Sequence, residues 1–385
     1  MQIGLYGLFG AATSAFFAEN LGVDLPWWVF VLVALALIGV CGYRQVDLSV
    51  KVLAMLVTLE FLIVLVLDIA ILIQGGGGGG GPITLTPFTW SSFISGSVAI
   101  ALLFNFASFI GFEATTIYSE EARDPKRTVP RATYLAVLTI GLFYTVTTWL
   151  MVEAQGAAGL QDFLAGLTPD PTAFLFVLGG TYLGPALTTV MALLFISSVF
   201  AALLAFHNAV ARYCYALGRE GLVPAHLGRT HVVHLSPHVG SVSQSVLALV
   251  VVLLFVVTGQ DPVLALFTWL TQLGTLAIIV LMALASFAVL AFFAANRHLD
   301  PNVLRTMVAP LVGGVAMAAV AVYAASQFGL LIGNPESALR WALPALIVVA
   351  AVVGIIAAMV LRGRSPQLYA QMGRHREVSL LHDDT

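Results

Sequence analysis

Apolar residues fill the chain in long runs, which short segments rich in glycine, proline or charge separate. Runs of about 20 apolar residues are long enough to cross a bilayer as helices, whereas a membrane β-barrel would show alternating segments of about ten residues. The pattern therefore predicts an all-α integral membrane protein with about 10 transmembrane helices. The predicted spans are residues 3–18, 27–43, 48–73, 93–119, 128–152, 173–213, 238–258, 263–293, 307–328 and 340–361.

Composition supports this prediction. Of the 385 residues, 60% are hydrophobic and 9% are charged, and the mean hydropathy is +0.99. No soluble domain of this length could cover its surface with so few polar side chains. We expect the whole chain to lie in or next to a membrane, in contact with lipid.

The basic residues predict an orientation. With the start of the first span inside, all of the 16 Lys and Arg residues except Arg340 fall on one face. Cytoplasmic loops carry the excess of positive charge in membrane proteins. The sequence thus predicts a multi-pass protein of the cytoplasmic (plasma) membrane with both termini cytoplasmic.

One stretch, Ala101 to Ala132, departs from the pattern of a lipid-facing helix. It begins as an apolar helix, meets Ser108, Gly111 and Glu113, and then becomes strongly charged. Membrane helices break only where the freed backbone groups are buried or line a watery cavity. A break here would aim bare carbonyls at a cation and bare amides at an anion. Close helix packing at the small residues is the structural alternative.

Several other features of the chain are interpreted as structural or as surface residues, without a role in a functional site. The seven glycines from Gly75 to Gly81 read as a flexible tether with no specified structure. Tryptophans near the proposed outer ends, Trp149 among them, read as interfacial anchors. Asp68 is expected near the outer interface. Histidines 226, 231, 234 and 238 read as surface residues and not as a metal site.

The sequence argues against several classes of function. There is no basic tract for nucleic acid, no GxxxxGK[ST] loop for ATP, and no clustered catalytic or metal-binding constellation. We therefore expect no enzyme activity, no cofactor and no metal.

Three motifs carry a family resemblance: FASFIGFEA from Phe106, EEARDPKRTVPRA from Glu120, and NAVARYCYALGREGLVP from Asn208. With them, the chain resembles the amino acid/polyamine/organocation superfamily of permeases. The resemblance implies a LeuT-like bundle with two inverted five-helix repeats and broken first and sixth helices around the substrate. The three motifs would be the broken sixth helix, the loop to the seventh, and the end of the eighth.

Counting back along the resemblance implies that the chain lacks the family's first two helices. The implied division is a remainder of the first repeat (1–73), the second repeat (93–293), two accessory helices (307–361) and a cytoplasmic tail (362–385). The first helix normally completes the substrate site. A truncated, non-transporting membrane fragment with a structural or interaction role is therefore the alternative to an active permease.

The resemblance also implies site residues. The substrate-binding candidates surround the break, where carbonyls would receive an amino group, Gly111 would permit the turn and a phenylalanine would act as a gate: Phe106, Ala107, Ser108, Phe109, Ile110 and Gly111.

Two carboxyls are candidates for carrying a proton. Glu113 lies just beyond the break, where burial favours the protonated form, and a structural hydrogen bond is the alternative. Glu60 lies at the middle of its span, where relatives that do not use sodium often carry a lysine. A salt bridge or a water-filled pocket would also explain Glu60.

Charged residues after the break alternate in sign, which suggests an ion-pair network at a cytoplasmic gate. A solvated loop is the alternative. These gate candidates are Glu120, Glu121, Arg123, Lys126 and Arg127.

The resulting prediction is secondary active transport of an amino acid or related amine by alternating access. The expected coupling ion is the proton in preference to sodium. The sequence does not specify the solute, the direction of transport or the oligomeric state.

Overall fold

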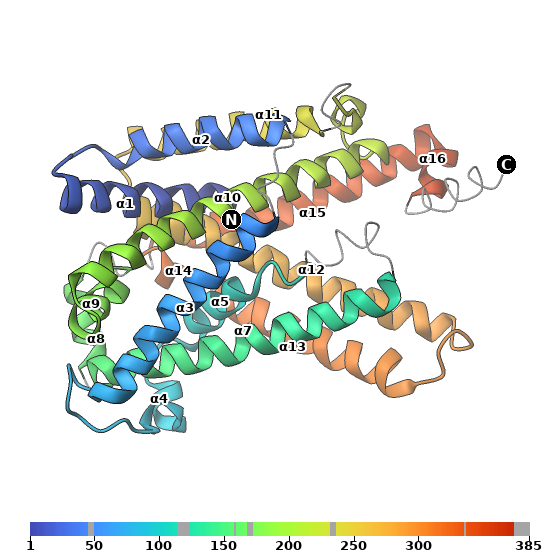
Figure 1. Ribbon diagram of the computed structural model, residues 1–385. Helices are drawn as coiled ribbons and strands as arrows, with labels where there is room; N and C mark the ends of the chain where they lie inside the picture. The colour runs from blue at the N-terminus through green and yellow to red at the C-terminus, as the bar shows by residue number, and fades with distance from the viewer. Residues whose placement is uncertain are drawn as a thin grey trace. The chain divides into compact units, whose positions relative to one another are not determined.

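The computed structural model describes residues 1–44, 50–113, 124–157, 159–167, 172–231, 236–334 and 336–372. Within these residues the chain is helical and contains no strand, apart from an isolated bridge between Gly76 and Gly81. This confirms the predicted all-α fold class. The helices (Figure 1) are α1 (Gln2–Leu21), α2 (Trp27–Arg44), α3 (Val50–Gln74), η1 (Thr86–Phe88), α4 (Trp90–Ile94), α5 (Val98–Phe109), α7 (Pro125–Gln155), α8 (Leu160–Gly166), α9 (Ala173–Tyr182), α10 (Pro185–Arg219), η3 (Ala225–Gly228), α11 (His238–Val257), η4 (Pro262–Phe267), α12 (Thr268–Ala295), η5 (Leu304–Val308), α13 (Ala309–Ser326), α14 (Phe328–Leu331), α15 (Leu339–Arg364) and α16 (Pro366–Gln371).

Eight helices of the described chain are long and apolar enough to cross a membrane. They coincide with eight of the predicted spans, so the protein is a multi-pass membrane protein. The predicted span 3–18 corresponds to α1, which is not among the eight because its Gly, Ser, Thr and Asn residues make it less apolar. Among the described residues of the predicted span 93–119, the helices are the end of α4 and the 12-residue α5.

Two predicted spans are divided by local sequence. In the span 173–213, Gly184 adopts a positive φ of 81° and Pro185 begins a new helix, so α9 and α10 are separate. In the span 93–119, α4 ends at Ile94, and the Ser97 side chain accepts a hydrogen bond from the Ile100 amide at the start of α5. A serine at this position satisfies one of the amides that a helix start leaves unpaired.

The contacts divide the chain into two compact units. Unit 1 comprises Met1, Met55–Phe195 and Thr268–Arg340, and unit 2 comprises Gln2–Ala54, Ile196–Phe267 and Trp341–Thr385. Both units combine segments that are distant in the sequence. The repeat boundaries implied by the family resemblance remain a prediction.

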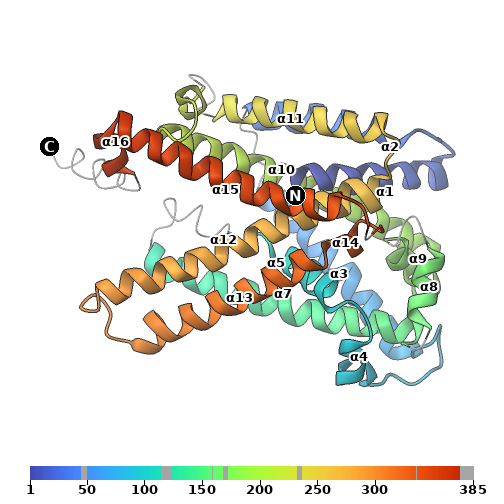
Figure 2. The ribbon, with the colours of Figure 1, turned by 180° about the vertical axis from the view of Figure 1, so that it is seen from behind.

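In unit 1, α12 and α13 lie side by side and are joined by a short connection (Figures 1 and 2), and α5 packs against α7, α12 and α13. The α12 and α13 helices approach closely at Gly314, where an added Cβ would lie 3.0 Å from the ring of Phe287. A second core joins α3, α7, α9 and the start of α10. Its buried residues are Ile63, Leu67, Ile71, Leu150, Ala154, Leu178, Tyr182 and Met191.

In unit 2, α2 packs against both α1 and α11 (Figures 1 and 2). Polar side chains lie inside this unit: the His207 Nε2 atom is 2.7 Å from the Ser241 hydroxyl, and Nδ1 is 3.4 Å from the Gln2 amide. Gly42 of α2 permits this arrangement, because a Cβ there would collide with the His207 ring.

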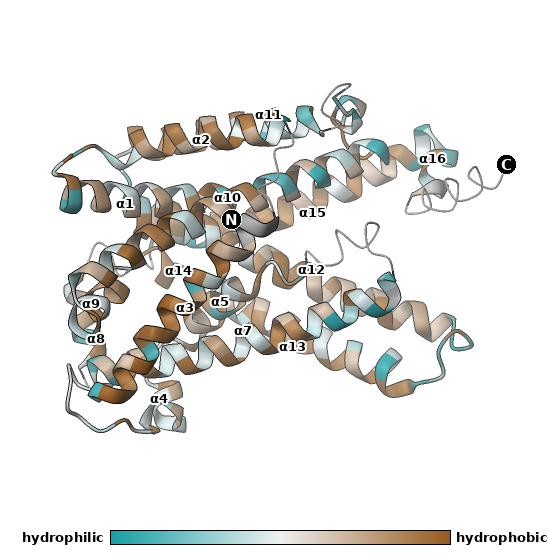
Figure 3. Cartoon of the chain, viewed as in Figure 1, coloured by the Kyte–Doolittle hydropathy of each residue, from teal (hydrophilic) through white to brown (hydrophobic). Residues whose placement is uncertain are grey.

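Outward-facing surfaces of the helices are apolar. Figure 3 shows hydrophobic residues along α2, α3, α12 and α13, and hydrophilic residues on α16 and on the connection between α12 and α13. None of the described residues of α15 is buried, although its hydropathy is among the highest of the eight. Lipid is the solvent that such a surface requires.

Candidate functional site

The helix α5 ends where the sequence predicts an interruption. Phe109 is its last residue, and Ile110 is extended, with φ −62° and ψ 131°. Gly111 follows with φ 118°, a conformation that side chains other than glycine rarely adopt. The continuation beyond Glu113, residues 114–123, lies outside the described residues.

The end of α5 presents backbone carbonyls. The last carbonyls of any helix lack an amide donor inside that helix. Here the Ile110 amide donates to the Ala107 carbonyl (3.2 Å) and the Phe112 amide to the Phe109 carbonyl (3.3 Å). Among the described residues, no amide beyond the helix donates to the carbonyls of Phe106 or Ser108. This end of the helix is therefore suited to an ammonium group.

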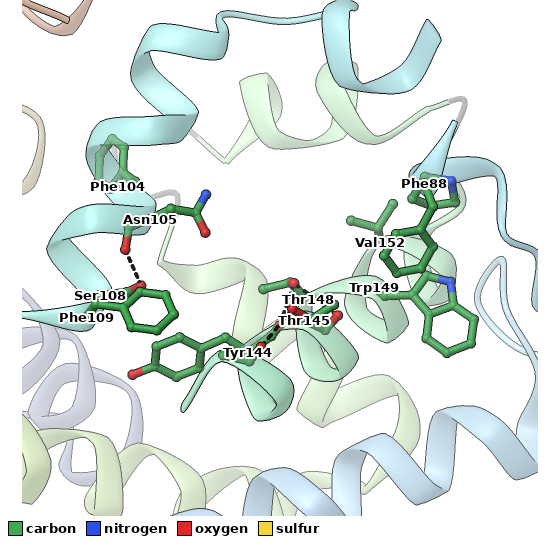
Figure 4. A pocket seen from close by; sticks show the side chains of 12 residues that line it. Phe88, Phe104, Asn105, Ser108, Phe109, Tyr144, Thr145, Thr148, Trp149 and Val152 are labelled. Carbon is green, nitrogen blue, oxygen red and sulfur yellow. Dashed lines mark hydrogen bonds between the residues drawn. The ribbon is translucent and has the colours of Figure 1, made fainter. Parts of the chain in front are cut away.

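A cleft of about 600 Å³ lies next to this end, between α5, α7 and the segment before α4 (Figure 4). All of its lining belongs to unit 1. The volume falls within the range of small-molecule sites. The lining residues are Pro87, Phe88, Phe104, Asn105, Ser108, Phe109, Gly141, Tyr144, Thr145, Thr148, Trp149 and Val152.

One face of α7 forms a wall of the cleft, since Gly141, Thr145, Thr148 and Val152 follow the three- and four-residue spacing of a helix face. The hydroxyl of Thr145 donates to the Gly141 carbonyl (2.7 Å), and that of Thr148 to the Tyr144 carbonyl (2.6 Å). On α5, the Ser108 hydroxyl donates to the Asn105 carbonyl (2.7 Å). These hydroxyl hydrogens are engaged, so their oxygens offer lone pairs to a ligand.

Aromatic side chains lie at both ends of the cleft (Figure 4). The Phe109 ring meets the Tyr144 ring edge to face, with centroids 6.2 Å apart, and the Phe88 ring lies 5.8 Å from that of Trp149. The amide of Asn105 projects into the space between them. The cleft thus combines apolar walls with a few polar groups, as small-molecule sites do.

Of the six substrate-binding candidates, Ser108 and Phe109 line the cleft, whereas Phe106, Ala107, Ile110 and Gly111 belong to the adjacent helix end and turn. Sequence reasoning missed the polar residues of α7. The spacing of Thr145 and Thr148 within an apolar span was the available signal.

The two proton-coupling candidates lie outside the cleft lining. The Glu113 carboxylate accepts the Gly111 amide (2.8 Å), so it forms the local hydrogen bond that was the structural alternative. Glu60 is half-buried on α3. A role for either in proton coupling remains a prediction.

The gate candidates are described only in part. Glu120, Glu121 and Arg123 lie outside the described residues, as does the side chain of Lys126. Arg127 is 3.9 Å from Asp124, and both side chains are largely exposed, 78% and 55%. A pair of this kind contributes little to stability.

The glycine run forms a defined structure, which corrects the prediction of a flexible tether. Gly76 and Gly81 exchange hydrogen bonds, and the amides of Gly77 and Gly78 donate to the carbonyls of Glu153 and Ala154 at the end of α7 (2.9 and 2.8 Å). Positive φ angles at five of the seven glycines explain why the segment needs them. We call residues 75–84 with the end of α7 the glycine clasp.

A buried carboxylate completes the clasp. Glu153, 5% exposed, accepts the Thr84 amide (2.6 Å) and the Thr84 hydroxyl (3.1 Å). The Trp149 indole donates to the Thr84 carbonyl (2.8 Å). Trp149 therefore has a specific partner, beyond the anchoring predicted for it.

A second buried carboxyl group lies on α3. Asp68 is 3% exposed within unit 1, and its position near the outer interface remains a prediction. Its Oδ2 atom accepts the Thr147 hydroxyl (2.7 Å), and its Oδ1 atom has no described partner.

The prediction of surface histidines is confirmed for His226, which is exposed, whereas His231 and His238 are half-buried. His231 and His238 lie edge to face with Tyr43 in unit 2, while His234 lies outside the described residues. Among the described residues, no group of three or more His, Cys, Asp or Glu is arranged to hold a metal ion.

Comparison with known proteins adds an independent finding. A model of the family "Amino acid permease" matches residues 5–363. The chain is 27% identical over 218 residues to the low-affinity putrescine importer PlaP of Escherichia coli strain K12, which covers 54% of the chain and 44% of that importer. It is 26% identical over 221 residues to the branched-chain amino acid permease BcaP of Bacillus subtilis strain 168 (57% of the chain, 43% of the permease).

A further relative is the lysine-specific permease of Saccharomyces cerevisiae, 28% identical over 196 residues, with 50% of the chain and 30% of the permease covered. The matches span less than half the length of each of these relatives. By their names, the three proteins act on putrescine, branched-chain amino acids and lysine.

Proposed function

The chain belongs to the amino acid permease family, and on that premise we propose that it carries an amino acid or related amine across a membrane. The transport cycle is alternating access, in which the site opens to one face of the membrane at a time. Both termini face the cytoplasm in this proposal.

The observation that carries the proposal is the end of α5 beside the cleft. An apolar helix stops at Phe109, and the carbonyls of Phe106 and Ser108 end it without a described amide donor. Such a stop in a membrane needs a polar partner. The ammonium group of a small solute supplies one.

The proposed roles of the site residues are those that the family resemblance implies, and this geometry supports them. The carbonyls of Phe106, Ala107, Ser108 and Ile110 receive the ammonium group, and Gly111 permits the chain to turn away. Phe109 covers the solute, since its ring already closes one end of the cleft against Tyr144. Phe106 is the alternative cover.

We further propose that a proton gradient drives transport. Glu113 and Glu60 are candidates to carry the proton. Burying an ionisable side chain in a membrane span costs free energy, so such residues commonly belong to ion or proton pathways. The charged residues Glu120, Glu121, Arg123, Lys126 and Arg127 form an inner-face network that loosens when the site opens inward.

The test is uptake by the purified full chain in proteoliposomes, with a panel of radiolabelled amino acids and diamines. A tryptophan at Thr145 would fill the cleft, and we expect it to abolish uptake. Leu142→Trp is the matched control, because Leu142 lies on α7 outside the cleft lining and is 70% exposed. Uptake of no solute by the unmodified chain, or equal uptake by both variants, would contradict the proposal.

A further inference from the structure

We propose that Asp68 is the carboxyl group that carries the coupling proton through the transport cycle. The proposal rests on the proposed transport function. An O–H bond forms on Asp68 with a proton from one side of the membrane and breaks when the proton leaves to the other side. The net result of a cycle is one proton moved with the solute.

The position of Asp68 is the first argument. It lies on α3 between Leu67 and Ile71, which are fully buried, and it contacts Thr147 of α7. Its side chain has almost no access to solvent, with 3% exposed. A charge in such surroundings is costly unless it is paired.

The hydrogen bonding of Asp68 is the second argument. Thr147 donates to Oδ2 at 2.7 Å, but the buried Oδ1 atom has no partner among the described residues. No described Lys, Arg or His lies within ion-pair distance of it. One donor does not compensate a buried carboxylate, so the neutral acid is the form that this conformation holds.

The basic residues of α3 and α7 lie near the starts of these helices, more than four turns from Asp68 and Thr147. On α7, Glu153 is bound to Thr84. On α9, the Tyr182 hydroxyl donates to the carbonyls of Gly75 and Ala154. On α3 itself, Glu60 is half-buried about two turns away. A proton is therefore the species that neutralises Asp68 here.

The helix α7 links Asp68 to the cleft. Thr147 bonds Asp68, and the adjacent Thr148 lines the cleft. A shift or rotation of α7 that accompanies solute binding must change both contacts, because the two residues are consecutive on one rigid helix. The proton affinity of Asp68 and the affinity for solute are then linked, and the linkage is reciprocal.

The test compares two transport modes of the full chain in proteoliposomes. Asp68→Asn keeps the shape of the side chain and removes the titration. With a gradient of about one pH unit, wild type is expected to accumulate solute up to about tenfold, since one unit is a tenfold proton ratio. Asp68→Asn is expected to lose this accumulation and to keep solute exchange at equal pH within about twofold of wild type. The exposed Asp162→Asn is the matched control and should match wild type in both modes.

A second variant covers the case in which Asp68→Asn is inactive in both modes. Thr147→Val removes the donor that stabilises the ionised carboxyl, so Asp68 should hold its proton to higher pH. The pH at which gradient-driven uptake is half-maximal should move upward.

The outcomes separate this proposal from the proposed function. Gradient-driven accumulation by Asp68→Asn at the wild-type level would overturn the role of Asp68, as would an unchanged pH profile in Thr147→Val. Wild-type uptake that ignores the pH gradient would also overturn it and leave transport intact. Failure of wild type to move any solute would instead refute the proposed function.

Discussion

Two carboxyl groups in unit 1, Asp68 and Glu153, are buried to a similar degree but differ in how many of their oxygens accept a hydrogen bond. Their exposed fractions are 3% and 5%. Both oxygens of Glu153 receive a donor from Thr84, whereas Asp68 has one donor and a bare oxygen. The two residues lie on helices that pack in the same core, so the difference is not one of environment alone.

The comparison shows how hydrogen bonding distinguishes a buried carboxyl group with a structural role from one with a functional role. A carboxylate whose acceptor sites are filled by fixed donors stabilises one conformation. A carboxyl with an unfilled site is a liability for stability, and such residues in membrane spans belong to ion or substrate pathways. Glu153 fits the first description and Asp68 the second.

The largest expected effect on stability comes from Glu153→Ala. It leaves the part-buried Thr84 amide without its acceptor and opens the glycine clasp, and we expect a loss of about 3 kcal/mol of unfolding free energy. Reversible unfolding in detergent micelles would measure it. Asp68→Asn should cost less than about 1 kcal/mol in the same assay. Equal losses of unfolding free energy in the two variants would contradict the structural difference between Glu153 and Asp68.

Next in size is Gly76→Ala. A Cβ at Gly76 would lie 2.6 Å from the Glu153 carbonyl oxygen, and we expect a loss of about 2 kcal/mol because backbone must shift. Gly77→Ala is the control, since it has open space around it and only a positive φ of 62°. Its strain should cost about 1 kcal/mol. If neither variant changes the unfolding free energy, the glycine clasp is not formed.

Thr147→Val should have a smaller effect on stability, about 1 kcal/mol, because it removes one hydrogen bond to a neutral acid. Thr145→Val, whose hydroxyl bonds only its own helix, is the control and should be close to wild type. Unfolding at several detergent concentrations would compare the two. A cost as large as that of Glu153→Ala would indicate that Asp68 is held as a charged, structural group.

The smallest expected effect is that of Trp149→Phe, which keeps the ring in the clasp and removes its donor to Thr84. We expect a loss of about 0.5 kcal/mol. Trp90→Phe is the control because Trp90 is 72% exposed. Tryptophan fluorescence during unfolding reports on both. A larger loss in the control would mean that anchoring outweighs the hydrogen bond.

Periodicity and composition were sufficient to predict the eight long apolar helices, because membrane spans must satisfy their own backbone and be apolar along their length. Ser108 and Gly111 were likewise sufficient to predict where α5 ends. Both features are local. A helix span or a glycine with a positive φ depends on residues within a few positions of it.

The clasp and Asp68 depend on partners that are distant in the sequence. Thr147 is 79 residues from Asp68, and Glu153 is 69 residues from Thr84. Seven glycines have no pattern of their own, and their structure depends on the two carbonyls at the end of α7 together with the hydrogen bonds between Gly76 and Gly81. The burial of Asp68 and the folded structure of the glycine segment could not be predicted without knowing which helices pack together.

Infrared spectroscopy of the carboxyl groups tests the difference between the two residues most directly. We expect the folded wild type at neutral pH to show the carbonyl band of a protonated carboxylic acid, which Asp68→Asn removes and Glu153→Gln retains. A band that persists unchanged in Asp68→Asn would contradict the account, because Asp68 would then not be the group that holds the proton.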